Sequence, residues 1–187
     1  MLKLTENVLN FWFGTTDLHA QIKPKKIWFK SSSEFDQDIR KRFLKDYENA
    51  VAERLNIMKK NQKGCLALII ILDQFSRNLF RQSPKAFAAD AKAREIAYYA
   101  ISKQYDRGIS NVARLFFYLP LEHSENLADQ KLSLKLLNNI NDKKTSRAAI
   151  QHYEIIHRFG RFPHRNAILS RENTQEEIRY LKNPPNW

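Results

Sequence analysis

Apolar side chains recur at every fourth position between residues 35 and 55, and this pattern limits the fold more than any other feature of the sequence. The residues on this stripe are Phe35, Ile39, Phe43, Tyr47, Val51 and Leu55. Because an α-helix has about 3.6 residues per turn, this spacing puts all six side chains on one face. The pattern predicts a long amphipathic helix with a buried apolar face.

The rest of the chain is also typical of helices. Its 187 residues include only 4 glycines and 6 prolines, and Ala, Leu, Lys, Glu and Arg, which favour helices, are abundant. The length suits one domain. We expect an all-α fold: a single domain over residues 1–187, with seven or eight helices packed as hairpins and a non-helical tail at 183–187.

Capping residues indicate where several helices begin and end. Thr5 can cap a first helix that stops at Gly14, and Thr145 can cap a later helix that stops at Gly160. Between the first two helices we expect a loop over residues 15–33, anchored by the aromatic pair 28–29.

Other segments show further helix signals. Residues 65–80 are apolar on nearly all sides as far as position 73, which predicts a central helix. Ser83-Pro84 is a start signal, Pro120 should end or kink the helix that contains 112–119, and leucines mark another helix at 127–137. Thr174-Gln-Glu-Glu177 has the spacing of a capping box.

Charge and cysteine content narrow the functional classes. The formal net charge is +12, but acidic residues interrupt the lysines of the first 50 residues, which favours a solvated surface of mixed charge. Cys65 is the only cysteine, which fits a reducing compartment. The apolar run 65–72 is far shorter than the ~20 residues that a membrane span needs. We therefore expect a cytoplasmic protein without membrane contact.

Polar side chains directly after the apolar run 65–72 form the first candidate site. Asp73, Gln74, Arg77 and Asn78 are candidate ligand-binding residues, because polar groups at the end of a buried helix should face a cleft or one another. Asp73 and Arg77 are four residues apart, so an ion pair that fixes helix packing is the competing interpretation.

A histidine between two carboxylates forms the second candidate site. Glu122, His123 and Glu125 are candidate catalytic residues, because neighbouring carboxylates stabilise the imidazolium that a general acid or base requires. The alternative makes Ser124 a helix N-cap, with Glu125 in the first turn against the helix dipole.

Histidines and arginines are densest in the third candidate site, around Gly160. His164 is a candidate catalytic residue. The candidate ligand-binding residues are His157, Arg161, Arg165 and Asn166. Guanidinium groups match the oxygens of carboxylates and phosphates, so this segment favours an anion site. It could instead fold a loop onto the core, with arginines capping helix carbonyls.

The metal-binding interpretation fails on spacing. Glu154-Ile-Ile-His157 has the Glu-x-x-His spacing of two-metal helical bundles, but only one such pair is present. His152 and His157 lie about 140° apart around a helix and cannot face one metal ion. We expect no metal and no cofactor.

Five sequence strings resemble a widespread bacterial family of unknown function with a tetratricopeptide-like helical fold. They are Val8-Leu-Asn-Phe-Trp-Phe-Gly14, Leu72-Asp-Gln-Phe-Ser-Arg-Asn78, Ala86-Phe-Ala-Ala-Asp90, Tyr118-Leu-Pro-Leu-Glu-His-Ser-Glu125 and Phe159-Gly-Arg-Phe-Pro-His-Arg-Asn166. Ser76 stands where the family usually has proline, and Ser170 where it usually has glycine. Ala52-Glu53 and Met58 replace an expected glycine and tryptophan. The resemblance implies the fold but no activity.

Three functional hypotheses follow. The first is a pocket formed by all three candidate sites, which binds a small anionic molecule and uses His–Glu acid–base chemistry. The second is a scaffold whose concave surface binds acidic peptides. RNA binding by Phe159, Phe162 and Arg165 ranks third, because the sequence has no recognised RNA-binding signature. The sequence leaves the oligomeric state open.

Overall fold

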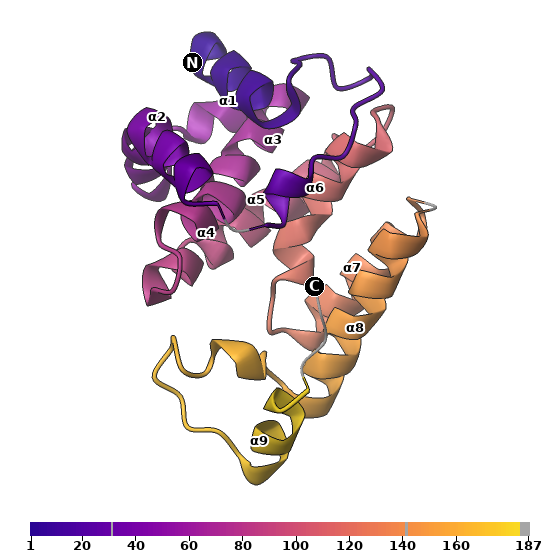
Figure 1. The fold of residues 1–187 in the computed structure, drawn as a ribbon. Helices are drawn as coiled ribbons and strands as arrows, with labels where there is room; N and C mark the ends of the chain where they lie inside the picture. Colours follow the sequence, from indigo (N-terminus) through magenta and orange to yellow (C-terminus); the bar gives the residue numbers. More distant parts are fainter. Residues whose placement is uncertain (31, 141, 184–187) are drawn as a thin grey trace. The chain divides into compact units, whose positions relative to one another are not determined.

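The chain is helical throughout the regular elements that its computed structural model describes, in residues 1–30, 32–140 and 142–183 (Figure 1). This confirms the predicted all-α fold. The chain divides into two compact units: an N-terminal unit of Met1–Arg81 and Lys85–Pro120, and a C-terminal unit of Gln82–Pro84 and Leu121–Trp187. The single domain expected over residues 1–187 stays a prediction. Of the expected tail, residues 184–187 lie outside the described residues.

The first part of the chain contains α1 to α6. The elements in order are α1 (Leu2–Phe13), η1 (Lys26–Trp28), α2 (Ser33–Val51), η2 (Asn56–Lys60), α3 (Gln62–Ile69), η3 (Ile70–Phe75), α4 (Ser76–Leu79), η4 (Pro84–Phe87), α5 (Asp90–Ser102) and α6 (Asn111–Glu122). The remaining elements are α7 (Leu127–Asn138), α8 (Lys143–Phe159), η5 (Pro163–Arg165) and α9 (Gln175–Leu181). Because α3, η3 and α4 follow one another without a break, the described residues contain eight α-helical segments, as predicted.

The central helix of the N-terminal unit is the continuous segment α3–η3–α4. Residues 65–72 are buried, as their apolar sequence predicts, and burial continues through the polar residues Asp73, Gln74 and Ser76. α3 contacts α1 and α5, whereas η3 and α4 contact α2. The middle segment, η3, is a π-helix, a rare geometry that is frequent at functional sites. It contains Asp73 and Gln74.

Aromatic packing fixes α1 against the loop that follows it. The Trp12 and Trp28 rings stack with centroids 5.9 Å apart, and Trp28 Nε1 donates to the Trp12 carbonyl oxygen at 3.2 Å. The predicted anchor is therefore Trp28, since Phe29 is 55% exposed. α1 ends at Gly14 with φ of 83°, as predicted, but it begins at Leu2, so buried Thr5 lies inside the helix and does not cap it.

Proline positions explain two further differences from the sequence prediction. Ser83-Pro84 opens the short turn η4, and α5 begins only at Asp90. Pro120 lies inside α6, which ends two residues later at Glu122. Because proline lacks an N–H group, it removes one backbone hydrogen bond near the end of α6.

The C-terminal unit is built on a helical hairpin, since α7 and α8 lie side by side (Figure 1). This pairing fits the expected tetratricopeptide-like packing. Asn126 caps α7 and Asp142 caps α8, in place of the predicted Ser124 and Thr145. α8 ends at Gly160 with φ of 67°, as predicted.

The core of the C-terminal unit lies where α8 meets the segment after it. Ile155, Ile156 and Phe162 are buried together, and Leu127, Phe159 and Tyr180 pack against them. The predicted capping box opens α9: Thr174 accepts from the Glu177 N–H, and the Glu177 side chain accepts from the Thr174 N–H.

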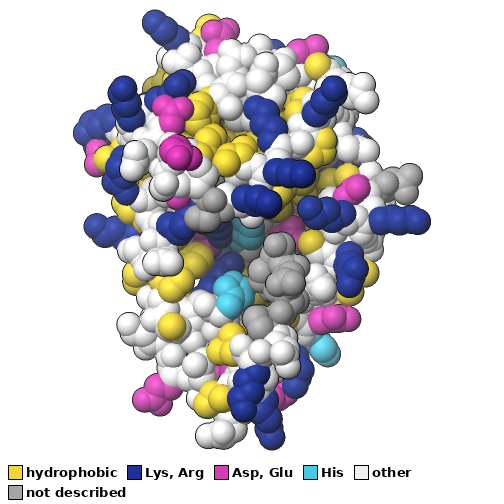
Figure 2. All heavy atoms as spheres, in the orientation of Figure 1, with side chains coloured by type: hydrophobic (Ala, Val, Ile, Leu, Met, Phe, Trp, Pro, Cys, Tyr) yellow, Lys and Arg dark blue, Asp and Glu magenta, His cyan; other side chains and the backbone are white. Residues whose placement is uncertain are grey.

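Surface charges are mixed. On the face shown in Figure 2, lysine and arginine side chains are spread widely, with acidic side chains between them. None of the described helices combines the length and the apolarity that crossing a membrane requires.

Gly64 provides a test of packing in the N-terminal unit. A Cβ atom there would overlap the backbone carbonyl of Met58, so Gly64→Ala should destabilise the protein by about 1–3 kcal/mol through overpacking. Helix propensity alone predicts a gain of about 1 kcal/mol. Urea unfolding decides the sign, with Lys63→Ala at the exposed neighbouring residue as the control, expected within about 0.5 kcal/mol of the parent. A stabilised Gly64→Ala protein would show that the backbones do not approach so closely.

Candidate functional site

The three predicted polar sites are divided between the two units. Residues 73–78 belong to the N-terminal unit, whereas residues 122–125 and 157–166 belong to the C-terminal unit. The single pocket expected from all three therefore stays a prediction. Contacts within each unit show what the individual side chains do.

Arg77 in the N-terminal unit lies between two carboxylates. Its guanidinium forms two hydrogen bonds with Asp90, at 2.9 and 3.0 Å, and a third with the Asp73 carbonyl oxygen at 2.7 Å. The Asp73 carboxylate lies 3.2 Å away and accepts from Gln74 at 2.6 Å. The predicted pairing of Asp73 with Arg77 is present, and Asp90 extends it to α5.

Asn78 and Arg81 both donate to Asp36 of α2. Asn78 lies 2.7 Å from Asp36 Oδ1, and the Arg81 fork bonds both carboxylate oxygens at 2.7 and 2.9 Å. Burial raises the pKa of Asp36, but these hydrogen bonds outweigh it and hold that pKa below its ordinary value. The polar side chains of residues 73–81 thus join the central helix to α2 and α5.

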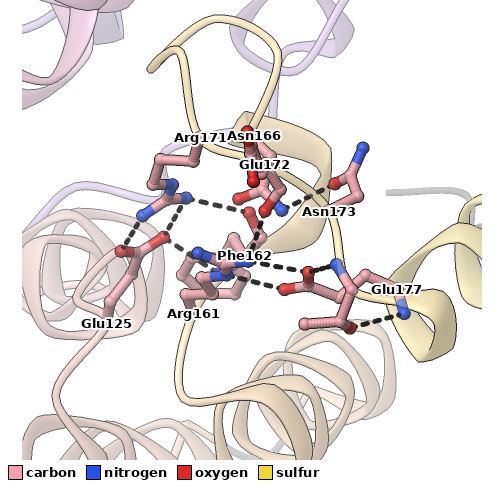
Figure 3. A network of polar contacts seen from close by, with 9 residues as sticks. Glu125, Arg161, Phe162, Asn166, Arg171, Glu172, Asn173 and Glu177 are labelled. Carbon is pink, nitrogen blue, oxygen red and sulfur yellow. Dashed lines mark hydrogen bonds and ion pairs between the residues drawn. The ribbon is translucent and has the colours of Figure 1, made fainter.

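Glu125 and Arg171 clamp the backbone of Phe162 in the C-terminal unit (Figure 3). The two side chains form a bidentate pair at 2.7 and 3.0 Å. Glu125 accepts from the Phe162 N–H at 2.9 Å, and Arg171 donates to the Phe162 carbonyl oxygen at 3.2 Å. Burial raises the pKa of Glu125, but Arg171 and the Phe162 N–H bring it below its ordinary value.

Arg161 forms a second bidentate pair, with Glu177 of α9 (Figure 3). The two bonds are 2.6 and 2.8 Å long, and the guanidinium also donates to the Glu172 carbonyl oxygen at 2.7 Å. Hydrogen bonds from Arg161, and then from the Thr174 backbone, lower the pKa of Glu177 to about 2 despite burial. Arg161, predicted to bind a ligand, therefore holds α9 to the segment after α8.

Asn166 also forms a hydrogen bond within this unit, with Asn173. It is fully buried, and its amide donates to Asn173 at 2.7 Å (Figure 3). Nearby Ser170 has φ of 53°, a left-handed conformation that favours glycine. This conformation fits the glycine that the family resemblance implies at this position.

Hydrogen bonds from buried side chains stabilise the turn between α6 and α7. Gln130 is buried, and its amide donates to the carbonyl oxygens of Glu122 and Ser124 at 2.6 and 2.7 Å. Ser124 donates to Asp129 at 2.6 Å and accepts from the Asn126 N–H at 3.1 Å. The Ser124 side chain therefore stabilises the turn, whereas capping belongs to Asn126.

His152 is a candidate that the sequence-based site prediction leaves out. Its Nδ1 atom lies 3.2 Å from a Glu122 carboxylate oxygen and 2.9 Å from the Ala148 carbonyl oxygen. The carboxylate expected to orient His123 thus contacts His152. A signal was present in the sequence, because His152 is three and four residues from buried Ile155 and Ile156 and shares their helix face.

Two histidines and an arginine surround the Phe162 ring; we name His152, Phe162, His164 and Arg165 the Phe162 cluster. The His152 and His164 ring centroids lie 5.4 and 5.5 Å from that of Phe162, and the Arg165 guanidinium lies 4.4 Å from it. Arg165 is 7% exposed and donates to the His123 carbonyl oxygen at 3.0 Å. Through this bond, Arg165 connects the cluster to the turn that contains His123.

Both histidines of the cluster are neutral at pH 7. Burial, opposed by the bond to Ala148 and assisted by the charges of His123 and Arg165, lowers the pKa of His152 to about 3. The His164 side chain reaches solvent, yet partial desolvation and then the charge of Arg165 lower its pKa to about 4. A positive potential thus acts on both rings.

His157 lies apart from these contacts. It is exposed and stacks on Tyr153, with ring centroids 5.6 Å apart and nearly parallel. The suggested role of His157 in ligand binding stays a prediction. Among the residues that the structure describes, no three His, Cys, Asp or Glu side chains are grouped so that they could hold a metal ion.

Comparisons with known proteins place these residues in a wider group. A family model described as a bacterial protein of unknown function (DUF924) matches residues 8–185. A solved structure of a protein of unknown function from Agrobacterium tumefaciens is 35% identical to the chain, covers 98% of this chain and 99% of that one, and gives a TM-score of 0.89. A comparison with curated proteins finds no match.

The clamp on Phe162 should contribute to stability. Arg171→Lys keeps the charge but loses the bidentate geometry and the bond to the Phe162 carbonyl, so we expect a loss of about 1–2 kcal/mol in urea unfolding. The matched control is Arg158→Lys, because Arg158 pairs with Glu176 while both side chains are about half exposed, at 56% and 49%. That change should cost less than about 0.5 kcal/mol. Equal losses in the two variants would contradict the clamp.

Glu177 should make the free energy of unfolding depend on pH in the acidic range. Because its pKa falls from 4.5 to about 2 on folding, its contribution is complete above pH 4.5 and is lost as the pH falls through about 2. Urea midpoints measured across this range should fall less steeply in Glu177→Gln than in the parent. Glu176→Gln, an exposed carboxylate of the same helix, should retain the parent's slope. Parallel curves for all three proteins would rule out this role for Glu177.

Proposed function

The chain belongs to the DUF924 family of bacterial proteins of unknown function, and we propose that its Phe162 cluster binds a small molecule carrying a carboxylate or phosphate. The observation that supports this most is the packing of Arg165 and two imidazoles around one aromatic ring. Arginine and histidine are side chains well suited to donating hydrogen bonds to such anions.

The electrostatics of the cluster favour an anion over a cation or a neutral ligand. Burial is the main reason why the pKa values of His152 and His164 are low, and the charge of Arg165 lowers both pKa values further. A negative charge bound beside them would offset that potential and raise both pKa values. In the acidic range around these pKa values, about 3 and 4, binding should therefore be accompanied by proton uptake, which links the ligand to acid–base chemistry.

Glu122 and His152 can supply that chemistry. Because His152 Nδ1 faces the Glu122 carboxylate and the Ala148 carbonyl, two acceptors, it carries the proton of the neutral ring. Nε2 is then the basic nitrogen, and the carboxylate stabilises the imidazolium that forms when Nε2 takes a proton. We therefore add the acid–base pair Glu122–His152 to the predicted catalytic residues Glu122 and His123, and the His123 carbonyl oxygen accepts from Arg165.

Arg161 and Arg171 have a supporting role in this proposal. Both guanidinium forks are bonded to carboxylates, Glu177 and Glu125 respectively, so they are poorly placed to bind a further anion. They fix the segment on either side of Phe162 and thereby position Arg165 and His164. The proposed ligand site is correspondingly smaller than the arginine-rich sequence suggests.

Histidine titration by NMR tests the proposal directly, with inorganic phosphate and citrate as the anions. We expect a saturating anion to raise the pKa of His164 from about 4 by about 1 or more. His164→Gln should weaken binding in calorimetry, and Arg165→Gln should abolish it. Exposed His157 provides the matched control: His157→Gln should bind both anions like the parent.

Two outcomes would overturn this function. If neither anion alters the His164 titration while the protein remains folded, the cluster is a structural feature only. If an acidic peptide such as polyglutamate binds the parent and His164→Gln equally well, the scaffold hypothesis replaces the small-anion site. Because His164 is exposed, its variant keeps the test valid even if Arg165→Gln fails to fold.

A further inference from the structure

Two tyrosines and two lysines lie close together in the N-terminal unit, in a region that the proposed anion site does not involve. Tyr98 and Tyr99, near the end of α5, are 40% and 36% exposed. We name Lys59, Tyr99, Lys103 and Tyr105 the Tyr99 patch. Within the patch, Tyr99 and Lys103 are exposed, whereas Lys59 and Tyr105 are partly buried. An aromatic ring that reaches solvent offers a face on which another ring can stack.

Basic groups lie against the ring of Tyr99 from two elements. Lys59 Nζ of η2 lies 6.0 Å from the ring centroid, and Lys103 Nζ, just after α5, lies 5.8 Å from it. Tyr105 adds a second ring, with its centroid 6.4 Å away at an interplanar angle of 73°. The arrangement places two positive charges and two aromatic rings within a few ångströms.

Hydrogen bonds hold these segments in place. The Tyr105 hydroxyl donates to the Lys60 carbonyl oxygen at 3.0 Å, which joins η2 to the turn after α5. Gln62 of α3 donates to the carbonyl oxygens of Tyr105 and Arg107, at 2.6 and 3.2 Å. The rings and charges are therefore presented on fixed backbone, which lowers the entropic cost of binding a partner.

We propose that the Tyr99 patch binds single-stranded RNA. A nucleobase stacks on the Tyr99 ring, and Lys59 and Lys103 move from the ring to the flanking phosphates. Base stacking on an exposed aromatic ring is stronger than the contact of an exposed lysine with the same ring, so a base displaces the ammonium groups. The net charge of +12 favours a polyanion.

The combination of groups selects RNA over other anions. An acidic peptide would use the lysines but gains little from the face of a tyrosine ring, whereas single strands use both. This site differs from the one first suggested for RNA, around Phe159, Phe162 and Arg165. The inference is independent of the proposed function, because it concerns other residues in the other unit.

Fluorescence anisotropy with a fluorescein-labelled oligouridylate of about ten nucleotides tests the proposal, since single-strand sites span about 4–16 nucleotides. Tyr99→Ala should weaken binding about tenfold or more by removing one stacking platform. Tyr99→Phe should bind like the parent. In Lys59→Gln/Lys103→Gln, the slope of log affinity against log salt should become shallower by about 0.7 for each phosphate that the protein no longer neutralises.

Matched variants separate the patch from general surface charge. Lys23→Gln/Lys26→Gln removes two exposed lysines, one before η1 and one at its first position, and Phe29→Ala removes an exposed ring just after η1. Both should bind the oligonucleotide like the parent. No binding at low salt, equal losses in the patch and control variants, or full competition by polyglutamate with no effect of Tyr99→Ala would each overturn the proposal.

Discussion

The carboxylate of Glu125 and the guanidinium of Arg171 together bond the N–H and the carbonyl of Phe162, and the C-terminal unit depends on this arrangement. Backbone groups that leave water need partners, and the segment after Gly160 belongs to no long helix that could supply them. A residue 37 positions earlier in the chain accepts from one group, and a residue 9 positions later donates to the other. The apolar ring of Phe162 can then be fully buried, and the side chains that surround it acquire fixed positions.

The arginines near Phe162 look alike in sequence but have two different environments in the structure. Arg161 and Arg171 each meet a glutamate of the protein in bidentate geometry, so their charges are largely neutralised within the fold. Arg165 instead lies over the Phe162 ring and donates to a backbone carbonyl, and its charge acts on the neighbouring imidazoles. The same local composition therefore yields two structural supports and one source of positive potential.

Helices and their C-terminal ends could be predicted well because the signals are local. The stripe from Phe35 to Leu55 continues through α2 into the following turn, and Gly14 and Gly160 adopt the left-handed conformation that ends a helix. The N-caps of α7 and α8 were less predictable. Two suitable capping residues stand close together at the start of each helix. The structure has Asn126, not Ser124, as the N-cap of α7, and Asp142, not Thr145, as the N-cap of α8. Spacing gives no signal for the π-helical segment 70–75, because one widened turn barely changes an apolar pattern.

The candidate site could be predicted only as a set of residue types, because its contacts join residues far apart in sequence. Glu177 meets Arg161 from 16 positions away, and Asp36 meets Arg81 from 45. Two arginines predicted to bind an anion, Arg77 and Arg161, are bonded to carboxylates of the same chain, as are Arg81 and Arg171. An arginine-rich segment therefore becomes evidence for an external anion only when the internal carboxylates within reach have been identified. Topology determines that reach, which is why His152, on the apolar face of α8, contacts Glu122 at the end of α6.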